Sequence, residues 1–255
     1  MLTPEPRSVK QRGRDSAHPS EARRSAKSLP RVLVFLKVPR AGRVKTRLAH
    51  AIGARNAARL YRAFLADTLA TVAESEAWSV EAHFAPPESP LARVRSLLPA
   101  GLRSRARLVP QARGTLGHRM AGAIKRAFRE GAPAVLLVGS DCPLLTRGHL
   151  ERALRALGDR DLVLGPAADG GYYLIGLRKP SVGVFRRIPW STGSVLARTL
   201  ERAETLGLST TLLGELSDID TLEDLNALRR YLRTRGSRVA RHTALALKSL
   251  PLELR

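Results

Sequence analysis

A cluster of cations follows the first apolar segment of the chain. Val32 to Leu36 is a continuous apolar run, as is typical of a strand buried on both faces of a parallel sheet. Within the next eleven residues the sequence places five cationic side chains around Gly42, namely Lys37, Arg40, Arg43, Lys45 and Arg47. A helix is predicted to begin near Val44 to Thr46. Free backbone N–H groups, a glycine turn and several cations together predict a phosphate site.

Known phosphate loops do not match this segment. Gly42-Arg43-Val44-Lys45-Thr46 is similar to the end of a P-loop, but Val44 stands where that motif needs a glycine. The chain also lacks the GxGxxG pattern of a dinucleotide site. The other interpretation is a solvated basic loop. Five cations at the carboxyl end of a first strand favour the anion site, because ligands of open α/β sheets bind at that edge.

Several carboxylates could complete such a site. Asp141 follows the apolar run from Ala134 to Val138, and Asp218 and Asp220 have the spacing of two that puts side chains on one side of an extended segment. Carboxylates at the ligand edge of a sheet suit Mg²⁺ or Mn²⁺, which take hard oxygen ligands. Asp141 could equally form an Asx turn before Pro143, and Asp220 could cap the helix expected from Thr221.

The elements that position these residues alternate between strand and helix. Leu60, Phe64, Leu65, Leu69 and Val72 recur at helical spacing within a helix predicted from Arg55 to Glu76. Further strands are predicted at residues 80–84, 107–110, 134–138, 162–164, 172–177 and 210–213. Shorter helices are predicted at residues 89–98, 148–157 and 193–206, and Thr221 begins a capping box for the last one. This order predicts a three-layer α/β fold with a mostly parallel sheet.

Five segments together identify a family resemblance. The segment KVPRAGRVKTRLA from Lys37 resembles the opening signature of bacterial GT-A-like transferases known as DUF2064, also described as arsenosugar-biosynthesis-type glycosyltransferases. Four later segments match the family and occur in its order. They are VGSDCP from Val138, GPAADGGYY from Gly165, PWST from Pro189 and DIDT from Asp218. The resemblance covers about Pro30 to Leu232. It implies a GT-A fold of the nucleotide-diphospho-sugar transferase type.

The resemblance also implies roles for particular residues. It assigns the metal to Asp141, although this chain has Ser140-Asp141-Cys142 instead of a full DXD. The second carboxylate must then come from elsewhere, and Asp218 is favoured over Asp220, which is nearer to the start of the last helix. The resemblance puts Asp169, Gly170 and Gly171 on the acceptor side, with Asp169 as general base if transfer inverts configuration. Trp190 could stack on a sugar or acceptor face or could be a buried core tryptophan. The nucleotide and its diphosphate would be held by Lys37, Arg40, Gly42, Lys45, Thr46 and Arg47 and by Gly114, Leu116 and Gly117. Lys45 would also act in catalysis by neutralising the leaving group.

The resulting hypothesis is a metal-dependent glycosyltransferase that uses Mg²⁺ or Mn²⁺, a nucleoside diphosphate-sugar donor and an unknown small-molecule acceptor. The first alternative is a nucleotidyltransferase of the same fold, joining an NTP to a phosphorylated acceptor. Its typical GGxGxRM-like first loop is absent, which favours glycosyl transfer. The second alternative is a non-catalytic basic binding protein, against which the intact Asp141, Asp169 and Asp218 count.

Composition sets the remaining expectations. The 255 residues suffice for one α/β domain, predicted at residues 30–232 between a disordered basic tail at 1–29 and a basic extension at 233–255. Of the net charge of +22, the first 31 residues carry +5 and the last 27 carry +7. Without aromatic interleaving, this charge predicts no specific nucleic-acid partner. One cysteine, no signal core and no apolar run of bilayer length predict a cytoplasmic location and no membrane span. The sequence does not determine the oligomeric state.

Overall fold

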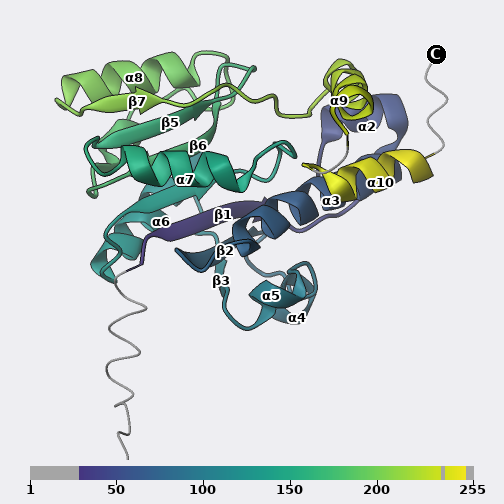
Figure 1. Cartoon of the computed structure of the whole chain (residues 1–255), viewed down its shortest axis with the longest axis horizontal. Coiled ribbons are helices and arrows are strands. Elements are labelled where there is room, and N and C mark those ends of the chain that lie inside the picture. Colours follow the sequence, from purple (N-terminus) through teal and green to yellow (C-terminus); the bar gives the residue numbers. More distant parts are fainter. Residues whose placement is uncertain (1–28, 237–238, 251–255) are drawn as a thin grey trace, which may run out of the picture.

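The computed structural model describes residues 29–236 and 239–250, which form one mixed sheet with helices on both faces (Figure 1). The predicted tail at residues 1–29 therefore lies outside the described residues except for Leu29. The strand order is β3-β2-β1-β4-β6-β5-β7. The strands are β1 (Arg31–Lys37), β2 (Ser79–Ala85), β3 (Arg107–Pro110), β4 (Val135–Val138), β5 (Leu162–Pro166), β6 (Tyr172–Leu177) and β7 (Thr210–Leu212).

The pairing directions determine which loops meet. Strands β3, β2, β1 and β4 pair in parallel, β6 is antiparallel to both β4 and β5, and β7 is parallel to β5. Six strands therefore point the same way and only β6 runs back. The ends of β1, β4 and β7 and the turn from β5 into β6 all lie at one edge of the sheet. The mostly parallel fold predicted from the sequence is confirmed.

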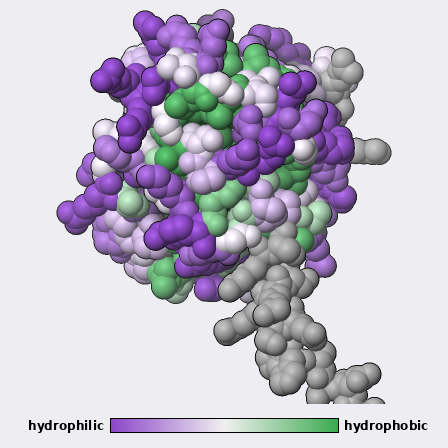
Figure 2. Space-filling view, turned by 90° about the vertical axis from the view of Figure 1, so that its left-hand side faces the viewer, coloured by the Kyte–Doolittle hydropathy of each residue, from purple (hydrophilic) through white to green (hydrophobic). Residues whose placement is uncertain are grey.

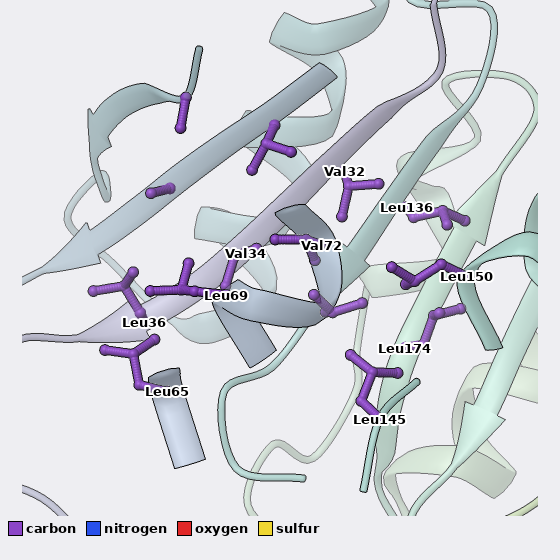
Figure 3. Close-up of a cluster of buried hydrophobic side chains, with 14 of the residues drawn as sticks. Val32, Val34, Leu36, Leu65, Leu69, Val72, Leu136, Leu145, Leu150 and Leu174 are labelled. Carbon is purple, nitrogen blue, oxygen red and sulfur yellow. The ribbon is translucent and has the colours of Figure 1, made fainter. Parts of the chain in front are cut away.

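The strands bury both faces because successive side chains of a strand point to opposite sides. Val32, Val34 and Leu36 of β1 pack with α3 (Ala54–Ala73), while Leu33 and Phe35 face α6 (Leu116–Arg129). Figure 3 shows the first of these faces, with Val32, Val34 and Leu36 beside Leu65, Leu69 and Val72 of α3. On the α3 side lie also α4 (Leu91–Arg95), α5 (Ala100–Arg103) and α7 (Arg147–Ala156). On the α6 side lie the 3₁₀ helix η1 (Val182–Phe185) and α8 (Val195–Thr205).

A third apolar cluster lies beyond the end of β1. It joins α2 (Thr46–Ile52), α3, α9 (Leu222–Arg235) and α10 (Arg241–Ser249), which gather on the right of Figure 1. Asp67 of α3 accepts hydrogen bonds from the backbone N–H groups of His242 (2.8 Å) and Thr243 (2.9 Å), at the start of α10. Part of the predicted C-terminal extension thus packs on α3.

Two details of the predicted elements are wrong. The helix predicted at residues 89–98 is limited to α4, and a separate helix, α5, begins after Pro99, because a proline disfavours helical backbone at the residue before it. The helix predicted from residue 193 begins only at Val195, as α8, and the Thr192 hydroxyl before it donates to the carbonyl oxygen of Pro189 at 2.7 Å. The capping box of Thr221 with Asp224 is confirmed.

Within the described part of the chain, no helix is both long and apolar enough to cross a bilayer. Figure 2 shows the face at the left of Figure 1, where hydrophilic side chains interrupt the hydrophobic ones.

Candidate active site at the carboxyl edge of the sheet

Lys45 is the central cation of the predicted phosphate loop. Its side chain is buried, and its Nζ lies 3.0 Å from Oδ1 of Asp141 and 2.7 Å from Oδ1 of Asp220. Burial alone would lower the pKa of Lys45, but these two carboxylates raise it well above its ordinary value. The lysine is therefore permanently charged. It holds together two carboxylates that follow different strands.

The backbone explains how Lys45 reaches them. Lys45 has a φ of 47°, in the left-handed region, and it directly precedes α2. Residues other than glycine adopt this conformation at a cost of about 1–2 kcal/mol. The ion pairs with Asp141 and Asp220 offset that cost, so the strained residue and the charge cluster depend on each other.

Tyr61 of α3 connects the same two loops below the site. Its hydroxyl accepts a hydrogen bond from the backbone N–H of Lys37 at 2.8 Å and lies 2.8 Å from the hydroxyl of Ser140, beside Asp141. Burial first, and the Asp141 carboxylate second, raise the pKa of Tyr61, which remains a neutral phenol. The tyrosine thus fixes the end of β1 relative to the end of β4. In the sequence, Tyr61 stands within the helix predicted from Arg55 to Glu76, and no local signal indicates these contacts.

The segment after β7 carries Asp218 into the site. Ala168 donates a backbone hydrogen bond to Leu216 at 3.1 Å, and Ile219 donates one to the carbonyl oxygen of Asp141 at 3.3 Å. Asp218 therefore lies between the β5–β6 turn and Asp141. Its partial burial and the nearby carboxylates of Asp169 and Asp220 raise its pKa to about 6. The carboxylates of Asp169, Asp218 and Asp220 therefore lie close together, and nearby cations do not fully neutralise them.

Asp220 has a different role from the capping role considered for it. Asp224 and Thr221 cap α9, and the Asp220 carboxylate bonds to Lys45 instead. No local sequence signal distinguishes these outcomes, because the choice depends on where Lys45 lies in three dimensions.

The turn between β5 and β6 presents Asp169 to solvent. Oδ1 of Asp169 accepts a hydrogen bond from the backbone N–H of Gly171 at 2.8 Å, which leaves Oδ2 free of contacts within the turn. Gly170 has a φ of 83°, and a Cβ there would lie 2.0 Å from the carbonyl oxygen of Gly193. There is thus no open space beside the Cα of Gly170, which was predicted on the acceptor side. The loop after η1 packs against it.

The remaining cations of the first loop are exposed. Lys37, Arg40 and Arg47 form no salt bridge with a described carboxylate, and Thr46 is exposed at the first position of α2. Gly42 has a φ of 74° and open space around it. These residues are free to contact an anionic ligand above Lys45.

One of the residues predicted to hold the nucleotide, Gly117, lies under Trp190. A Cβ on Gly117 would lie 2.6 Å from Nε1 of the indole, so glycine is needed for close packing at this position. Leu116 is partly buried in the core on the α6 side, while Gly114 turns the chain with a φ of 111°. Gly117 therefore packs against a protein side chain, and its role in holding the nucleotide stays a prediction. Trp190, predicted on the acceptor side, lies directly over it.

The donor set fits a divalent cation in its chemistry. Four carboxylates, those of Asp141, Asp169, Asp218 and Asp220, lie at one edge, where burial and the charges of Asp169 and Asp220 raise the pKa of Asp218. Their side chains are not gathered as a preformed cluster of three or more ligating groups anywhere in the described residues. Cys142 is buried and burial raises its pKa, which argues against a thiolate ligand or nucleophile.

Comparisons with known proteins agree with this architecture. Residues 68–192 match the family described as "Uncharacterized protein conserved in bacteria (DUF2064)". A crystal structure from Desulfovibrio desulfuricans G20, provisionally described as a nucleotide-diphospho-sugar transferase, superposes with a TM-score of 0.79 at 35% identity. That match covers 87% of this chain and 95% of the other. The chain therefore shares the nucleotide-diphospho-sugar transferase-like fold across nearly all of its relative.

One further relative is a nucleotidyltransferase by name, and one further solved structure shares the fold. A 2-phospho-L-lactate guanylyltransferase from Methanopyrus kandleri is 42% identical over 92 residues, which is 35% of this chain and 46% of that protein. The chain thus aligns with less than half of that relative. A 4-diphosphocytidyl-2C-methyl-D-erythritol synthase from Anaerococcus prevotii has a TM-score of 0.54 at 11% identity, covering 81% of this chain and 99% of that one. At that identity the likeness concerns the fold alone.

Proposed function

The chain belongs to the bacterial family described as DUF2064, and from this we propose that it is a metal-dependent nucleotidyltransferase. The observation that carries the proposal is the buried Lys45 ammonium, held between Asp141 and Asp220 where the strands end. The 42% identity to a guanylyltransferase favours nucleotidyl transfer over the glycosyl transfer predicted from the sequence. The reaction would join the nucleotidyl group of an NTP to a phosphorylated acceptor.

In this reaction the cationic side chains of the site would bind the phosphates, and its carboxylates would bind the metal ion. An oxygen of the acceptor phosphate would attack the α-phosphorus of the NTP, and the bond from that phosphorus to the bridging oxygen of pyrophosphate would break. Lys37, Arg40, Lys45 and Arg47 would bind the phosphates and stabilise the leaving pyrophosphate. Asp141 and Asp218 would hold Mg²⁺ or Mn²⁺. When bound, that ion supplies positive charge to the phosphate oxygens.

Glycosyl transfer from a nucleoside diphosphate-sugar is the second candidate. It is favoured by the first loop, which lacks the GGxGxRM-like pattern, and by the exposed Asp169 carboxylate on the side expected for the acceptor. The two reactions make different demands on Asp169. In glycosyl transfer, the hydroxyl group of the acceptor must lose its proton to a base. In nucleotidyl transfer, the attacking phosphate of the acceptor is already anionic and needs no base.

Product analysis distinguishes the two reactions. We would incubate the full chain and Mg²⁺ with each NTP and a panel of phosphorylated small molecules, and separately with nucleoside diphosphate-sugars, and follow both by ³¹P NMR. We expect pyrophosphate from one NTP, no consumption of the sugars, and little effect of Asp169→Asn. Release of nucleoside diphosphate from a sugar donor, slowed by Asp169→Asn, while every NTP stays intact, would overturn the proposal in favour of glycosyl transfer.

A further inference from the structure

A cavity of about 530 Å³ lies on the α6 side of the sheet, apart from the carboxylates. One wall comes from α6, including Gly117, His118 and Lys125, and the other from residues 182–190. Because β6 runs against the other strands, the chain leaves it at the far edge and returns along α6 toward the carboxyl edge. The cavity therefore lies between α6 and this returning segment, which reaches Gly193 beside Gly170.

The walls of this cavity combine apolar surface with positive charge. Val182, Phe185 and Ile188 supply apolar groups beside Trp190. The charged lining residues are Lys125, Arg186 and Arg187, all exposed, and none of them pairs with a described carboxylate. No described residue that lines the cavity is acidic. An apolar space whose rim carries only cations matches a ligand with an apolar body and an anionic group.

The loop that carries these residues is held in an unfavourable conformation. Arg187 has a φ of 58° and Ser191 a φ of 67°, both in the left-handed region that favours glycine. Trp190, between them, packs on Gly117 and lies near Phe185, with ring centroids 6.3 Å apart. A residue keeps a strained backbone conformation only where the surrounding structure fixes it, and such residues are common in ligand-binding segments.

The same loop is attached to the turn that carries Asp169. Leu196 donates a backbone hydrogen bond to the carbonyl oxygen of Gly170 at 2.8 Å, and Gly170 packs against Gly193. The cavity and the carboxylate edge are therefore joined through a short and rigid connection. A molecule lying in the cavity would extend past Trp190 toward Asp169.

We propose that this cavity binds the body of the acceptor, a small molecule with an apolar moiety of about the size of an aromatic ring and an anionic group remote from its reacting end. This inference rests on the proposed transferase function, which it deepens by naming the acceptor class. The remote anion is either a phosphate or a carboxylate, since Lys125, Arg186 and Arg187 bind both.

The two tryptophans of the chain allow a direct binding test. Trp78 is buried in the core and its indole N–H donates to the carbonyl oxygen of Val72 at 3.0 Å, whereas Trp190 lines the cavity. In ¹⁵N-tryptophan-labelled protein, Trp190→Phe assigns the two indole N–H signals. We would titrate the full chain with phenyl phosphate, benzoate and the uncharged benzyl alcohol. We expect either anion to move the Trp190 signal alone and benzyl alcohol to bind about tenfold more weakly.

Matched variants distinguish a loss of binding caused by a missing cation from one caused by a disturbed fold. Arg186→Ala should weaken binding of the preferred anion several-fold, while Arg160→Ala removes the same charge from an exposed site outside the cavity and should change nothing. Arg187→Gly should also weaken binding, although glycine relieves the left-handed backbone, so lost folding cannot explain that result. Tighter binding of phenyl phosphate identifies the remote group as phosphate, and tighter binding of benzoate identifies it as carboxylate.

Three results would overturn the inference. They are an unmoved Trp190 signal with both anions, equal binding of benzyl alcohol, and displacement of the bound anion by NTP with Mg²⁺, which would assign the cavity to the nucleotide. A different result would contradict the proposed reaction without contradicting the proposed cavity ligand. Protein that binds phenyl phosphate beside Trp190 but releases no pyrophosphate from any NTP would keep the anion site and lose nucleotidyl transfer.

Discussion

Two groups of charged side chains lie on the same sheet and differ in how completely their charges are paired. On the α6 side, Glu81 of β2 contacts Arg31 at 3.1 Å, His83 at 2.9 Å and also Arg126. Glu130 completes this group by pairing with Arg31 and with Arg107. Burial alone would raise the pKa of Glu81, but its hydrogen bond to His83 and the arginines lower it below the ordinary value. Each carboxylate here has more than one cationic partner.

The carboxyl edge is the opposite case. Four carboxylates lie there, and Lys45 is the only buried cation that pairs with any of them in the described residues. The pKa of Asp218 is raised to about 6, where that of Glu81 is lowered. A paired network stabilises the fold, whereas an excess of negative charge at the ligand edge is stabilised when a cation and its ligand bind. The contrast supports the proposal that the first cluster is structural and that the carboxyl edge binds a ligand.

Breaking the paired network should have the largest effect on stability. Glu81→Gln leaves Arg31 and Arg126 without their buried anion, and we expect a loss of about 3–5 kcal/mol in the free energy of unfolding, measured with urea. Glu76→Gln is the control, because the Glu76 side chain is 91% exposed and its loss should change stability by less than about 0.5 kcal/mol. Equal effects of the two variants would show that the buried network does not stabilise the fold.

Removing the central cation of the edge should affect turnover more than folding. Lys45→Met takes away the charge that joins Asp141 to Asp220, and we expect turnover to fall about 100-fold, equivalent to ~2.7 kcal/mol of transition-state stabilisation. Arg160→Met removes an exposed cation at the opposite edge of the sheet and is the control. Retention of normal turnover by folded Lys45→Met would remove this residue from the site.

The smallest expected effect is a pH-dependent gain in stability. The folded-state pKa of Asp218 lies above its unfolded value, so its charged form destabilises the metal-free fold as pH rises from about 4 through about 6. Asp218→Asn should therefore stabilise metal-free protein at pH 8, by at most about 1 kcal/mol because the residue is only partly buried, and not at about pH 3.5. Asp159→Asn, an exposed change, should show no such pH dependence. A difference that stays constant across this pH range would contradict the electrostatic account.

The sequence predicts the site's location better than its internal contacts. Strands that read as apolar runs, each followed by Lys45, Asp141 or Asp169, suffice to bring those residues to one edge, because a parallel sheet aligns the ends of its strands. The pairing of Asp220 with Lys45 joins residues 175 positions apart, and the hydrogen bond between Tyr61 and Ser140 joins residues 79 positions apart. The close packing of Trp190 on Gly117 is also tertiary. Local patterns carry no information about such contacts.

Metal binding tests the central claim of an unpaired, cation-binding edge most directly. We would titrate Mn²⁺ by electron paramagnetic resonance into the full chain, with and without NTP, and repeat this with Asp141→Asn and Asp161→Asn. Asp161 is the matched control, because its carboxylate pairs with Arg178 at 2.8 Å.

We expect one Mn²⁺ that binds at least about tenfold more tightly when NTP is present. Asp141→Asn should lose this binding, and Asp161→Asn should retain it. Normal NTP-linked Mn²⁺ binding by Asp141→Asn, with its fold intact, would contradict the account.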